Sequence, residues 1–195
     1  MLPTIATLKS ALRHEVRRRL ENLTPEQRDV ASRRLCARLQ QQPVWLNARA
    51  VLGFAPTAGE PDIWPLLQAA LAEGRTVALP RFAPDRDAYE AAVVRDLSRD
   101  LVVARFGIRE PSCACRTLAV SEVDLILVPG VAFDLRGHRL GRGKGYYDRL
   151  LTGARAVKCA VAFEEQIVEA VPVEPQDVRV DCIVTAERWV QIAVA

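Results

Sequence analysis

Hydrophobic periodicity predicts two helices at the beginning of the chain. In residues 5–21, apolar side chains recur at helical spacing at Leu8, Leu12, Val16 and Leu20. Charged residues fill the positions between them, which is typical of an amphipathic helix. Thr24, Pro25 and Gln27 then supply an N-cap, a first-turn proline and a capping-box partner for a second helix that ends near Gln41.

After residue 49 the pattern changes to short apolar runs of strand length, separated by helical segments. Residues 50–55 predict a buried strand, residues 63–73 a helix that stops at Gly74, and residues 76–79 a strand that ends at Pro80. Further strands are predicted at residues 89–94, 125–128, 157–162 and 182–185, with a helix beginning near Tyr146. The order strand, helix, strand indicates parallel pairing.

These elements predict an α/β fold with three layers, in which a doubly wound, mostly parallel sheet is flanked by helices. No linker, repeat or low-complexity block interrupts the sequence, so residues 1–195 are expected to form one domain. In such folds ligands bind at the carboxyl ends of the strands, where residues 56–60 would lie.

The segment 125–148 carries the clearest chemical signal. An apolar strand leads into Gly141, Gly143 and Gly145, where backbone amides can approach phosphate oxygens, while Arg139, Arg142 and Lys144 add positive charge. A Walker phosphate loop would need glycine at 138 and a hydroxyl at 145, and a dinucleotide fingerprint would need glycine at 146; neither is present. From these residues alone, an arginine-rich surface loop remains an alternative to a nucleotide site.

Val128 to Asp134, followed by Arg139 to Asp148, resembles the signature of the 5-formyltetrahydrofolate cyclo-ligase family. The resemblance extends along the chain through Lys9 with Arg13, Glu60, residues 74–81, residues 106–111 and residues 180–181. It implies conversion of 5-formyltetrahydrofolate to 5,10-methenyltetrahydrofolate, with ATP as co-substrate, Mg²⁺ as cofactor, and ADP and phosphate as products.

The resemblance also implies roles for individual residues. The ATP contacts would be Lys9, Arg13, Arg139, Leu140, Gly141, Arg142, Gly143, Lys144, Gly145, Tyr146 and Tyr147. Lys144 and Arg142 would be catalytic, with Lys144 nearest the transferred phosphoryl group. The folate contacts would be Glu60, Arg142, Gly143, Lys144, Gly145 and Tyr146, and the magnesium ligands would be Asp148 and Asp181.

Plainer interpretations of the acidic residues remain open. Asp148 suits the first turn of any helix, Glu60 suits a loop or a helix start, and Asp181 suits a solvent-facing strand end. Two positions depart from the family pattern. Pro61-Asp62-Ile63 lacks the threonine that many relatives have after this glutamate, and Gln176-Asp177 stands where histidine-aspartate is frequent.

Composition narrows the class of protein. A net charge of +3 without a dense basic stripe argues against a nucleic-acid surface, and the apolar runs are too short to span a membrane. The first ten residues lack a secretion signal, so a cytoplasmic location is expected, with small-molecule substrates and a monomeric chain. The five scattered cysteines are expected to be reduced, because nothing completes a zinc site around Cys113 and Cys115.

Besides an active cyclo-ligase, two other interpretations stay open on the sequence. One is a family member that binds nucleotide or folate without this turnover, including one that acts on another amide-like substrate. An RNA-binding module that uses the Arg-Gly loop is the third interpretation, and it would give a salt-sensitive RNA complex.

Overall fold

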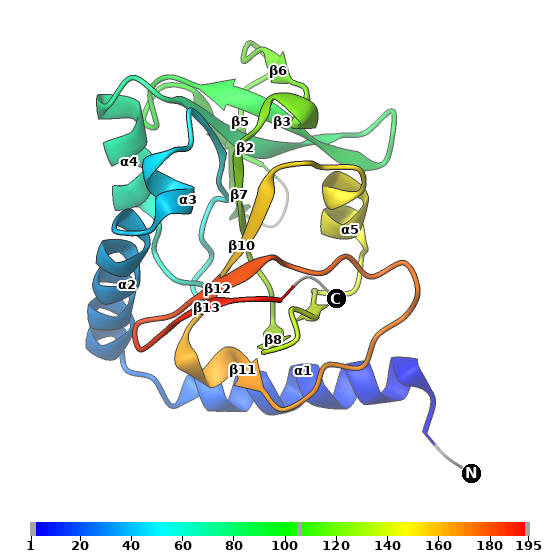
Figure 1. The fold of residues 1–195 in the computed structure, drawn as a ribbon. Helices are drawn as coiled ribbons and strands as arrows, with labels where there is room; N and C mark the ends of the chain where they lie inside the picture. Colours follow the sequence, from blue (N-terminus) through cyan, green and yellow to red (C-terminus); the bar gives the residue numbers. More distant parts are fainter. Residues whose placement is uncertain (1–2, 105–106, 194–195) are drawn as a thin grey trace.

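An eight-stranded sheet forms the centre of the molecule, and helices cover both of its faces (Figure 1). The computed structural model describes residues 3–104 and 107–193. Phe106, at the start of the patch 106–111, therefore lies outside the described residues. The strand order is β13-β12-β10-β7-β1-β2-β3-β6, and the five strands from β12 to β2 run parallel. The three-layer, mostly parallel α/β fold is confirmed.

The strands of the large sheet are β1 (Ala50–Leu52), β2 (Thr76–Ala83), β3 (Ala88–Val94), β6 (Thr117–Leu118), β7 (Leu125–Val128), β10 (Val157–Val161), β12 (Cys182–Val184) and β13 (Trp189–Gln191). Two small sheets add β4 (Leu101–Val103) with β5 (Arg109–Pro111), and β11 (Ile167–Val168) with β8 (Ala132–Asp134) and β9 (Arg139–Leu140). The helices are α1 (Ile5–Glu21), α2 (Pro25–Gln40), α3 (Pro43–Leu46), α4 (Trp64–Ala72) and α5 (Tyr146–Leu151), with short 3₁₀ turns η2 (Val120–Glu122) and η3 (Glu164–Gln166).

Alternation along β7 shows how the sheet is buried on both faces. Leu125 and Leu127 pack with the side chains of α2, α3 and α4, whereas Ile126 and Val128 pack on the opposite face with α5. All four residues are fully buried. A strand covered on both faces is uniformly apolar, which explains why it appears in the sequence as a continuous hydrophobic run.

The helix boundaries follow the capping residues. Thr24 accepts a hydrogen bond from the backbone N–H of Gln27, and the Gln27 side chain accepts one from the backbone N–H of Thr24, which completes the predicted capping box. Gly74 follows α4 with a φ of +76°, and its N–H donates to Leu71. Glycine adopts this left-handed conformation without steric cost, so α4 ends where the sequence predicted.

The prediction that Pro80 ends a strand was wrong. β2 continues through Pro80 to Ala83, pairing antiparallel with β3, with Pro80 opposite Ala91. On the other side, β1 pairs with β2 only from Thr76 to Ala78. Beyond that point β3 is the one strand of the described residues that pairs with β2, so a residue without an N–H is tolerated.

The predicted apolar face of α1 needs a correction. Val16 and Leu20 are buried, but Leu8 is 42% exposed and its neighbour Lys9 is only 8% exposed. Lys9 occupies this packed face because Glu174 and Asp177 neutralise its ammonium group. Polar chemistry therefore overrides the hydrophobic pattern in the first half of the helix.

Among the described residues, no helix is both long enough and apolar enough to span a bilayer. All five cysteines are free thiols, as expected.

Candidate active site

The segment between β7 and α5 has two parts with different character. Residues 131–140, here called the anchoring hairpin, form β8, a tight turn and β9, with Phe133 paired to Arg139. Residues 141–145, here called the glycine loop, follow without regular structure and lead into α5. The sequence predicted one glycine-rich loop here, whereas the structure has a paired strand on each side of the turn.

Asp134 fixes the turn of the anchoring hairpin. Its fully buried carboxylate accepts backbone hydrogen bonds from Arg136, His138 and Val171. The ring Nδ1 of His138 lies 3.0 Å from Oδ2 of the same carboxylate. Burial alone would raise the pKa of Asp134, but the hydrogen bonds from Val171 and His138 outweigh it and lower the pKa. Asp134 therefore stays ionised and holds the hairpin in place.

The glycine loop needs glycine and is solvent-exposed. Gly143 has a φ of +104° and Gly145 a φ of +66°, conformations that other residues adopt only with strain. The side chain of Arg13 reaches the loop from α1, with Nε donating to the carbonyl oxygen of Gly141 at 2.9 Å. Lys144, at the tip, is exposed and has no ion pair or hydrogen bond with any described residue. Its ammonium is available to a ligand.

Two cavities meet at the glycine loop. One, here called the aromatic cavity, is lined by Phe54, Tyr89, Tyr146 and Tyr147 together with Glu60, Glu110 and Arg142. The other, here called the polar cavity, is lined by Lys9, Arg13, Gly143, Glu174 and Asp177. Both cavities share Arg139, Gly141, Lys144, Gly145 and Asp148. A group bound in one cavity would therefore lie next to a group bound in the other.

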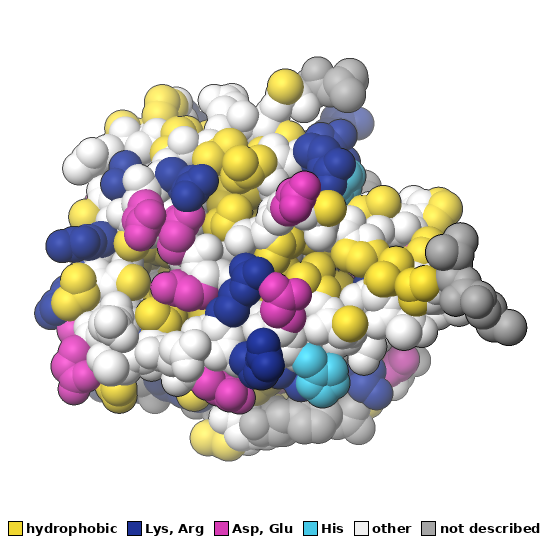
Figure 2. Space-filling view, turned by 90° about the horizontal axis from the view of Figure 1, so that it is seen from below, with side chains coloured by type: hydrophobic (Ala, Val, Ile, Leu, Met, Phe, Trp, Pro, Cys, Tyr) yellow, Lys and Arg dark blue, Asp and Glu magenta, His cyan; other side chains and the backbone are white. Residues whose placement is uncertain are grey.

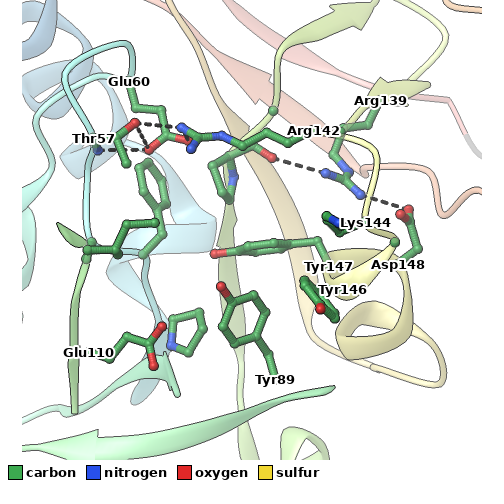
Figure 3. Close-up of a pocket in the computed structure, with 18 of the residues that line it drawn as sticks. Thr57, Glu60, Tyr89, Glu110, Arg139, Arg142, Lys144, Tyr146, Tyr147 and Asp148 are labelled. Atoms are coloured by element: carbon green, nitrogen blue, oxygen red, sulfur yellow. Dashed lines mark hydrogen bonds and ion pairs between the residues drawn. The ribbon is translucent and has the colours of Figure 1, made fainter. Parts of the chain in front are cut away.

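Three tyrosines form the apolar wall of the aromatic cavity (Figure 3). The ring of Tyr89 lies edge-on to those of Tyr146 and Tyr147, with centroids 5.4 and 6.1 Å apart. Burial, and to a smaller degree the nearby carboxylate of Glu60, raises the pKa of Tyr147 well above its ordinary value. The phenol therefore stays neutral and offers a hydroxyl beside a flat apolar surface.

Glu60 and Arg142 form a polar bridge across the mouth of the aromatic cavity (Figure 3). One carboxylate oxygen of Glu60 accepts from the backbone N–H and hydroxyl of Thr57, at 2.9 and 3.0 Å. The other lies 2.8 Å from Nη2 of Arg142, which also donates to the hydroxyl of Thr57. The loop after β1 and the glycine loop are thus connected through one ion pair.

Arg139 is buried between the two cavities. Its Nη2 donates to Oδ1 of Asp148 at 2.8 Å, its Nη1 donates to the carbonyl oxygen of Pro129 at 3.3 Å, and its Nε has no partner. Oδ2 of Asp148 accepts no hydrogen bond from any described residue. Asp148 lines both cavities, so this free carboxylate oxygen and the fixed guanidinium of Arg139 lie on a residue pair that the two cavities share.

The polar cavity holds a lysine that is already neutralised. Nζ of Lys9 lies 2.6 Å from Asp177 and 2.8 Å from Glu174. Burial would lower the pKa of Lys9, but the hydrogen bonds to Asp177 and Glu174 outweigh burial and raise it. On the face seen in Figure 2, acidic and basic side chains lie interspersed, without a continuous basic stripe. The positive charge of Lys9 is therefore balanced locally.

Asp181 is not brought to the site. It precedes the first residue of β12, at the amino end of a parallel strand, and lines neither cavity. Its carboxylate accepts from the backbone N–H and the ammonium of Lys158, at 2.7 and 3.1 Å. Of the predicted metal pair Asp148 and Asp181, only Asp148 therefore lies in the cavity walls. Among the described residues, no group of three acidic, histidine or cysteine side chains is placed to bind a metal.

Comparison with known proteins identifies the family to which this fold and these cavities belong. Residues 5–186 match the model of the 5-formyltetrahydrofolate cyclo-ligase family. The 5-formyltetrahydrofolate cyclo-ligase of Escherichia coli K12 is 33% identical over 177 residues, which cover 89% of this chain and 97% of that protein. The chain belongs to the 5-formyltetrahydrofolate cyclo-ligase family. The Mycolicibacterium smegmatis enzyme of the same name is 35% identical over 150 residues, covering 74% of this chain and 77% of that one.

A solved cyclo-ligase-type structure has the same fold. The 5,10-methenyltetrahydrofolate synthetase of Aquifex aeolicus superposes with a TM-score of 0.86 at 36% identity, covering 96% of this chain and 94% of that chain. Sequence and fold thus agree on an enzyme of this family over most of the chain.

The structure of this cyclo-ligase family member gathers the other residues predicted from sequence around the two cavities. The predicted residues that line the aromatic cavity are Glu60, Arg139, Gly141, Arg142, Lys144, Gly145, Tyr146, Tyr147 and Asp148. Those that line the polar cavity are Lys9, Arg13, Arg139, Leu140, Gly141, Gly143, Lys144, Gly145 and Asp148. Their contacts with nucleotide and folate remain predictions.

The lining residues of this cyclo-ligase family member that were missed as site residues include Thr57, Tyr89, Glu110 and Glu174. Thr57 lies in the loop predicted at the carboxyl end of β1, so its position was available from the sequence. Glu110 lies in a patch that carried the family resemblance, but no chemical reason singled it out. Tyr89 and Glu174 reach the site only through the path of β3 and of the segment before β12, which the sequence pattern does not give.

Proposed function

We propose that the chain converts 5-formyltetrahydrofolate to 5,10-methenyltetrahydrofolate with ATP and Mg²⁺, releasing ADP and phosphate. The observation that carries the proposal is the pair of cavities joined by the glycine loop. A flat aromatic wall suits a pterin ring, and a basic, glycine-lined cavity suits a polyphosphate. Lys144 lies at the junction, where the phosphoryl group would pass from one ligand to the other.

The chemistry explains why such a junction is needed. The N5-formyl group is an amide, and its oxygen leaves poorly when N10 attacks the formyl carbon. Transfer of the γ-phosphoryl group forms an oxygen–phosphorus bond at the formyl oxygen and breaks the bond to ADP. N10 then bonds to the formyl carbon, the carbon–oxygen bond breaks, phosphate leaves with the formyl oxygen, and N10 loses its proton. The protein contributes positioning and charge neutralisation.

Lys144 suits the transferred phosphoryl group because its ammonium is exposed and unpaired. Charge builds up on the phosphoryl oxygens during transfer, and a positioned cation stabilises that charge. Arg142 lies on the same loop and is held by Glu60, so its guanidinium is oriented before a ligand binds. We assign Lys144 and Arg142 the catalytic roles on this basis.

Arg13 and Lys9 are placed to receive the rest of the polyphosphate. Arg13 already contacts the glycine loop through the carbonyl oxygen of Gly141. Lys9 is engaged by Asp177 and Glu174, which leaves one of its three N–H donors for a phosphate oxygen.

The residues at the junction fit Mg²⁺ with one protein ligand. Mg²⁺ commonly binds one or two carboxylates, several waters and the phosphates of the substrate. Asp148 offers the free Oδ2, and Arg139 fixes the rest of its carboxylate. When bound, the ion would neutralise phosphate charge. Asp181 has no part in this proposal.

The remaining expectations stay predictions of this account: a monomer in the cytoplasm that acts on small molecules rather than on nucleic acid or membranes. They depend on the same proposal, because a soluble folate substrate needs neither a membrane nor a partner chain. Gel filtration with light scattering tests the monomer.

The experiment that tests the function follows methenyltetrahydrofolate by its absorbance, starting from 5-formyltetrahydrofolate with and without ATP and Mg²⁺. The expected result is product only when ATP and Mg²⁺ are both present, with one ADP formed per product. Binding of Mg²⁺-ATP without methenyl product would contradict the proposal and favour a family member with another activity.

A further inference from the structure

Arg109 is a positively charged residue at the solvent-exposed rim of the aromatic cavity. It begins β5, and its neighbours Ile108 and Glu110 line the same cavity. Glu110 is buried, whereas Arg109 is exposed. Successive side chains of a strand point to opposite faces, which explains this difference. A ligand that extends out of the cavity can therefore reach the guanidinium of Arg109.

Two contacts hold this guanidinium in place. Its Cζ lies 5.1 Å from the centroid of the Trp64 ring, so the cation packs on an aromatic face. Its Nη2 donates to the carbonyl oxygen of Leu97. Most of its N–H donors have no partner among the described residues, and no carboxylate of those residues pairs with it. The group is thus oriented before a ligand binds, which lowers the entropy that binding would cost.

The other cations of the aromatic cavity are either paired or part of the glycine loop. Arg139 is neutralised by Asp148, and Arg142 by Glu60. Lys144 has no acidic partner, but it lines the polar cavity as well. Among the described residues, the arginine at the start of β5 is thus the one unpaired cation that lines only the aromatic cavity.

The proposed substrate attracts cations at two distant ends. One end is the formyl oxygen at N5, which receives the phosphoryl group and is assigned to Lys144. The other end is the glutamate beyond the aminobenzoyl ring, which carries two carboxylates. Figure 3 shows Glu110, the neighbour of Arg109, across the pocket from Lys144, with Tyr89 and Tyr147 between them. An unpaired cation on that side complements the carboxylates of the glutamate.

We propose that Arg109 binds a carboxylate of the glutamate tail of the substrate and so favours folates whose tail is acidic. This inference rests on the proposed function and adds a residue that the sequence did not predict for the site. A planar guanidinium matches a carboxylate through two parallel hydrogen bonds. Ile108 offers an apolar contact to the aminobenzoyl ring beside it. The predicted contact of Glu60 with the folate is unchanged by this assignment.

The experiment compares 5-formyltetrahydrofolate with its dimethyl ester, in which both tail carboxylates are neutral. Dissociation constants are measured by calorimetry without nucleotide, so the readout does not depend on turnover. The wild type is expected to bind the ester about 3- to 10-fold more weakly, between the effects of an exposed ion pair and of a hydrogen bond to a charged group. Arg109→Met keeps a contact with Trp64 but removes the charge. This variant is expected to bind the acid as weakly as the ester.

Three further variants complete the comparison. Arg99→Met removes an exposed arginine that pairs with Asp96 and lines neither cavity, so it makes the same change in net charge. Wild-type discrimination is expected for it, and equal loss in Arg99→Met and Arg109→Met would overturn the inference. Arg109→Lys restores the charge without the planar fork and is expected to recover part of the discrimination. Arg109→Gln is a second neutral variant, which decides the matter if Arg109→Met fails to fold.

The remaining outcomes separate this inference from the proposed function. Wild-type discrimination in a folded Arg109→Met variant, or equal affinity of the wild type for acid and ester, would overturn the role of Arg109 while methenyl formation still supports the reaction. Failure of the wild type to bind or convert 5-formyltetrahydrofolate would overturn both. Weaker binding of the acid in Arg109→Met, with an unchanged dissociation constant for Mg²⁺-ATP, supports the contact with the tail.

Discussion

The anchoring hairpin and the glycine loop are consecutive in sequence, yet they differ in almost every physical respect. In the hairpin, Asp134 and Phe133 are fully buried and the polar groups around the turn are hydrogen-bonded to Asp134. In the loop, residues 142–144 are exposed, and Lys144 has no partner among the described residues. The hairpin stabilises the fold, whereas the loop leaves the positive charge of Lys144 available to a ligand. One sequence motif is thus divided after Leu140 into a segment that holds the fold and a segment that is available for chemistry.

The largest expected effect comes from removing the charge at the loop tip. Lys144→Ala is expected to lower kcat for methenyl formation about 10²- to 10³-fold, because a positioned cation at the transferred phosphoryl group is lost. The melting temperature should stay unchanged, because the exposed Lys144 makes no hydrogen bond or ion pair with a described residue. Steady-state kinetics and thermal unfolding measure both effects.

Lys158→Ala is the matched control for this prediction. Lys158 pairs with Asp181 and lines neither cavity, so wild-type turnover is expected. Equal turnover in Lys144→Ala and Lys158→Ala would show that Lys144 takes no part in the reaction. It would also contradict the difference in role between the glycine loop and the anchoring hairpin.

The second effect is on stability and tests the hairpin. Asp134→Ala is expected to cost about 3 kcal/mol in the free energy of unfolding, because three backbone N–H groups lose their buried acceptor. Urea unfolding monitored by circular dichroism measures this loss. A loss below about 0.5 kcal/mol, the range of ordinary surface substitutions, would show that the hairpin does not depend on Asp134.

The pH dependence of the same contribution follows from the lowered pKa of Asp134. A carboxyl group with a lower pKa in the folded state stabilises the fold above its unfolded pKa of about 3.9 and loses that contribution as the pH falls through the folded value. The difference in unfolding free energy between wild type and Asp134→Asn should therefore be constant near neutral pH and shrink below about pH 4. A difference that shrinks instead between pH 6 and 8 would assign it to another group.

These two regions also show what the sequence could and could not predict. The β1-α4-β2 unit, the capping box at Thr24 and the basic glycine loop followed from local patterns. The continuation of β2 through Pro80 depends on where β1 ends, which is a tertiary fact. The burial of Lys9 depends on Glu174 and Asp177, about 165 residues away in sequence.

The site was predictable to the extent that its residues lie in one segment. Residues 139–148 carry most of the shared wall, so their proximity follows from sequence alone. Of the two predicted metal ligands, Asp148 lines both cavities, whereas Asp181 pairs with Lys158 and lines neither. Asp134 was part of the motif, but its role as the acceptor for the turn requires knowledge of the hairpin.

A smaller effect tests the backbone of the loop. Gly143→Ala is expected to destabilise the backbone conformation of the glycine loop by about 1 to 3 kcal/mol, because a φ of +104° is strained for any residue with a side chain. The expected result is a rise of about tenfold in the KM for ATP, equivalent to about 1.4 kcal/mol, with folate binding less affected. Gly59→Ala, where an added Cβ meets nothing within 4 Å and φ is not in the left-handed region, serves as control. Equal KM values in both variants would contradict the prediction.

The smallest effect concerns the metal. Asp181→Asn is expected to leave the Mg²⁺ concentration for half-maximal activity unchanged, because Asp181 is bound to Lys158 and lines neither cavity. Asp148→Asn is expected to raise that concentration. A shift in Asp181→Asn as large as in Asp148→Asn would restore Asp181 as a ligand.

The most direct test of the central claim follows the formyl oxygen itself. 5-Formyltetrahydrofolate labelled with ¹⁸O at the formyl group is converted with ATP and Mg²⁺, and the released phosphate is analysed by mass spectrometry. Transfer of the γ-phosphoryl group across the glycine loop predicts one ¹⁸O atom in each phosphate. Unlabelled phosphate, formed together with methenyl product, would contradict the account.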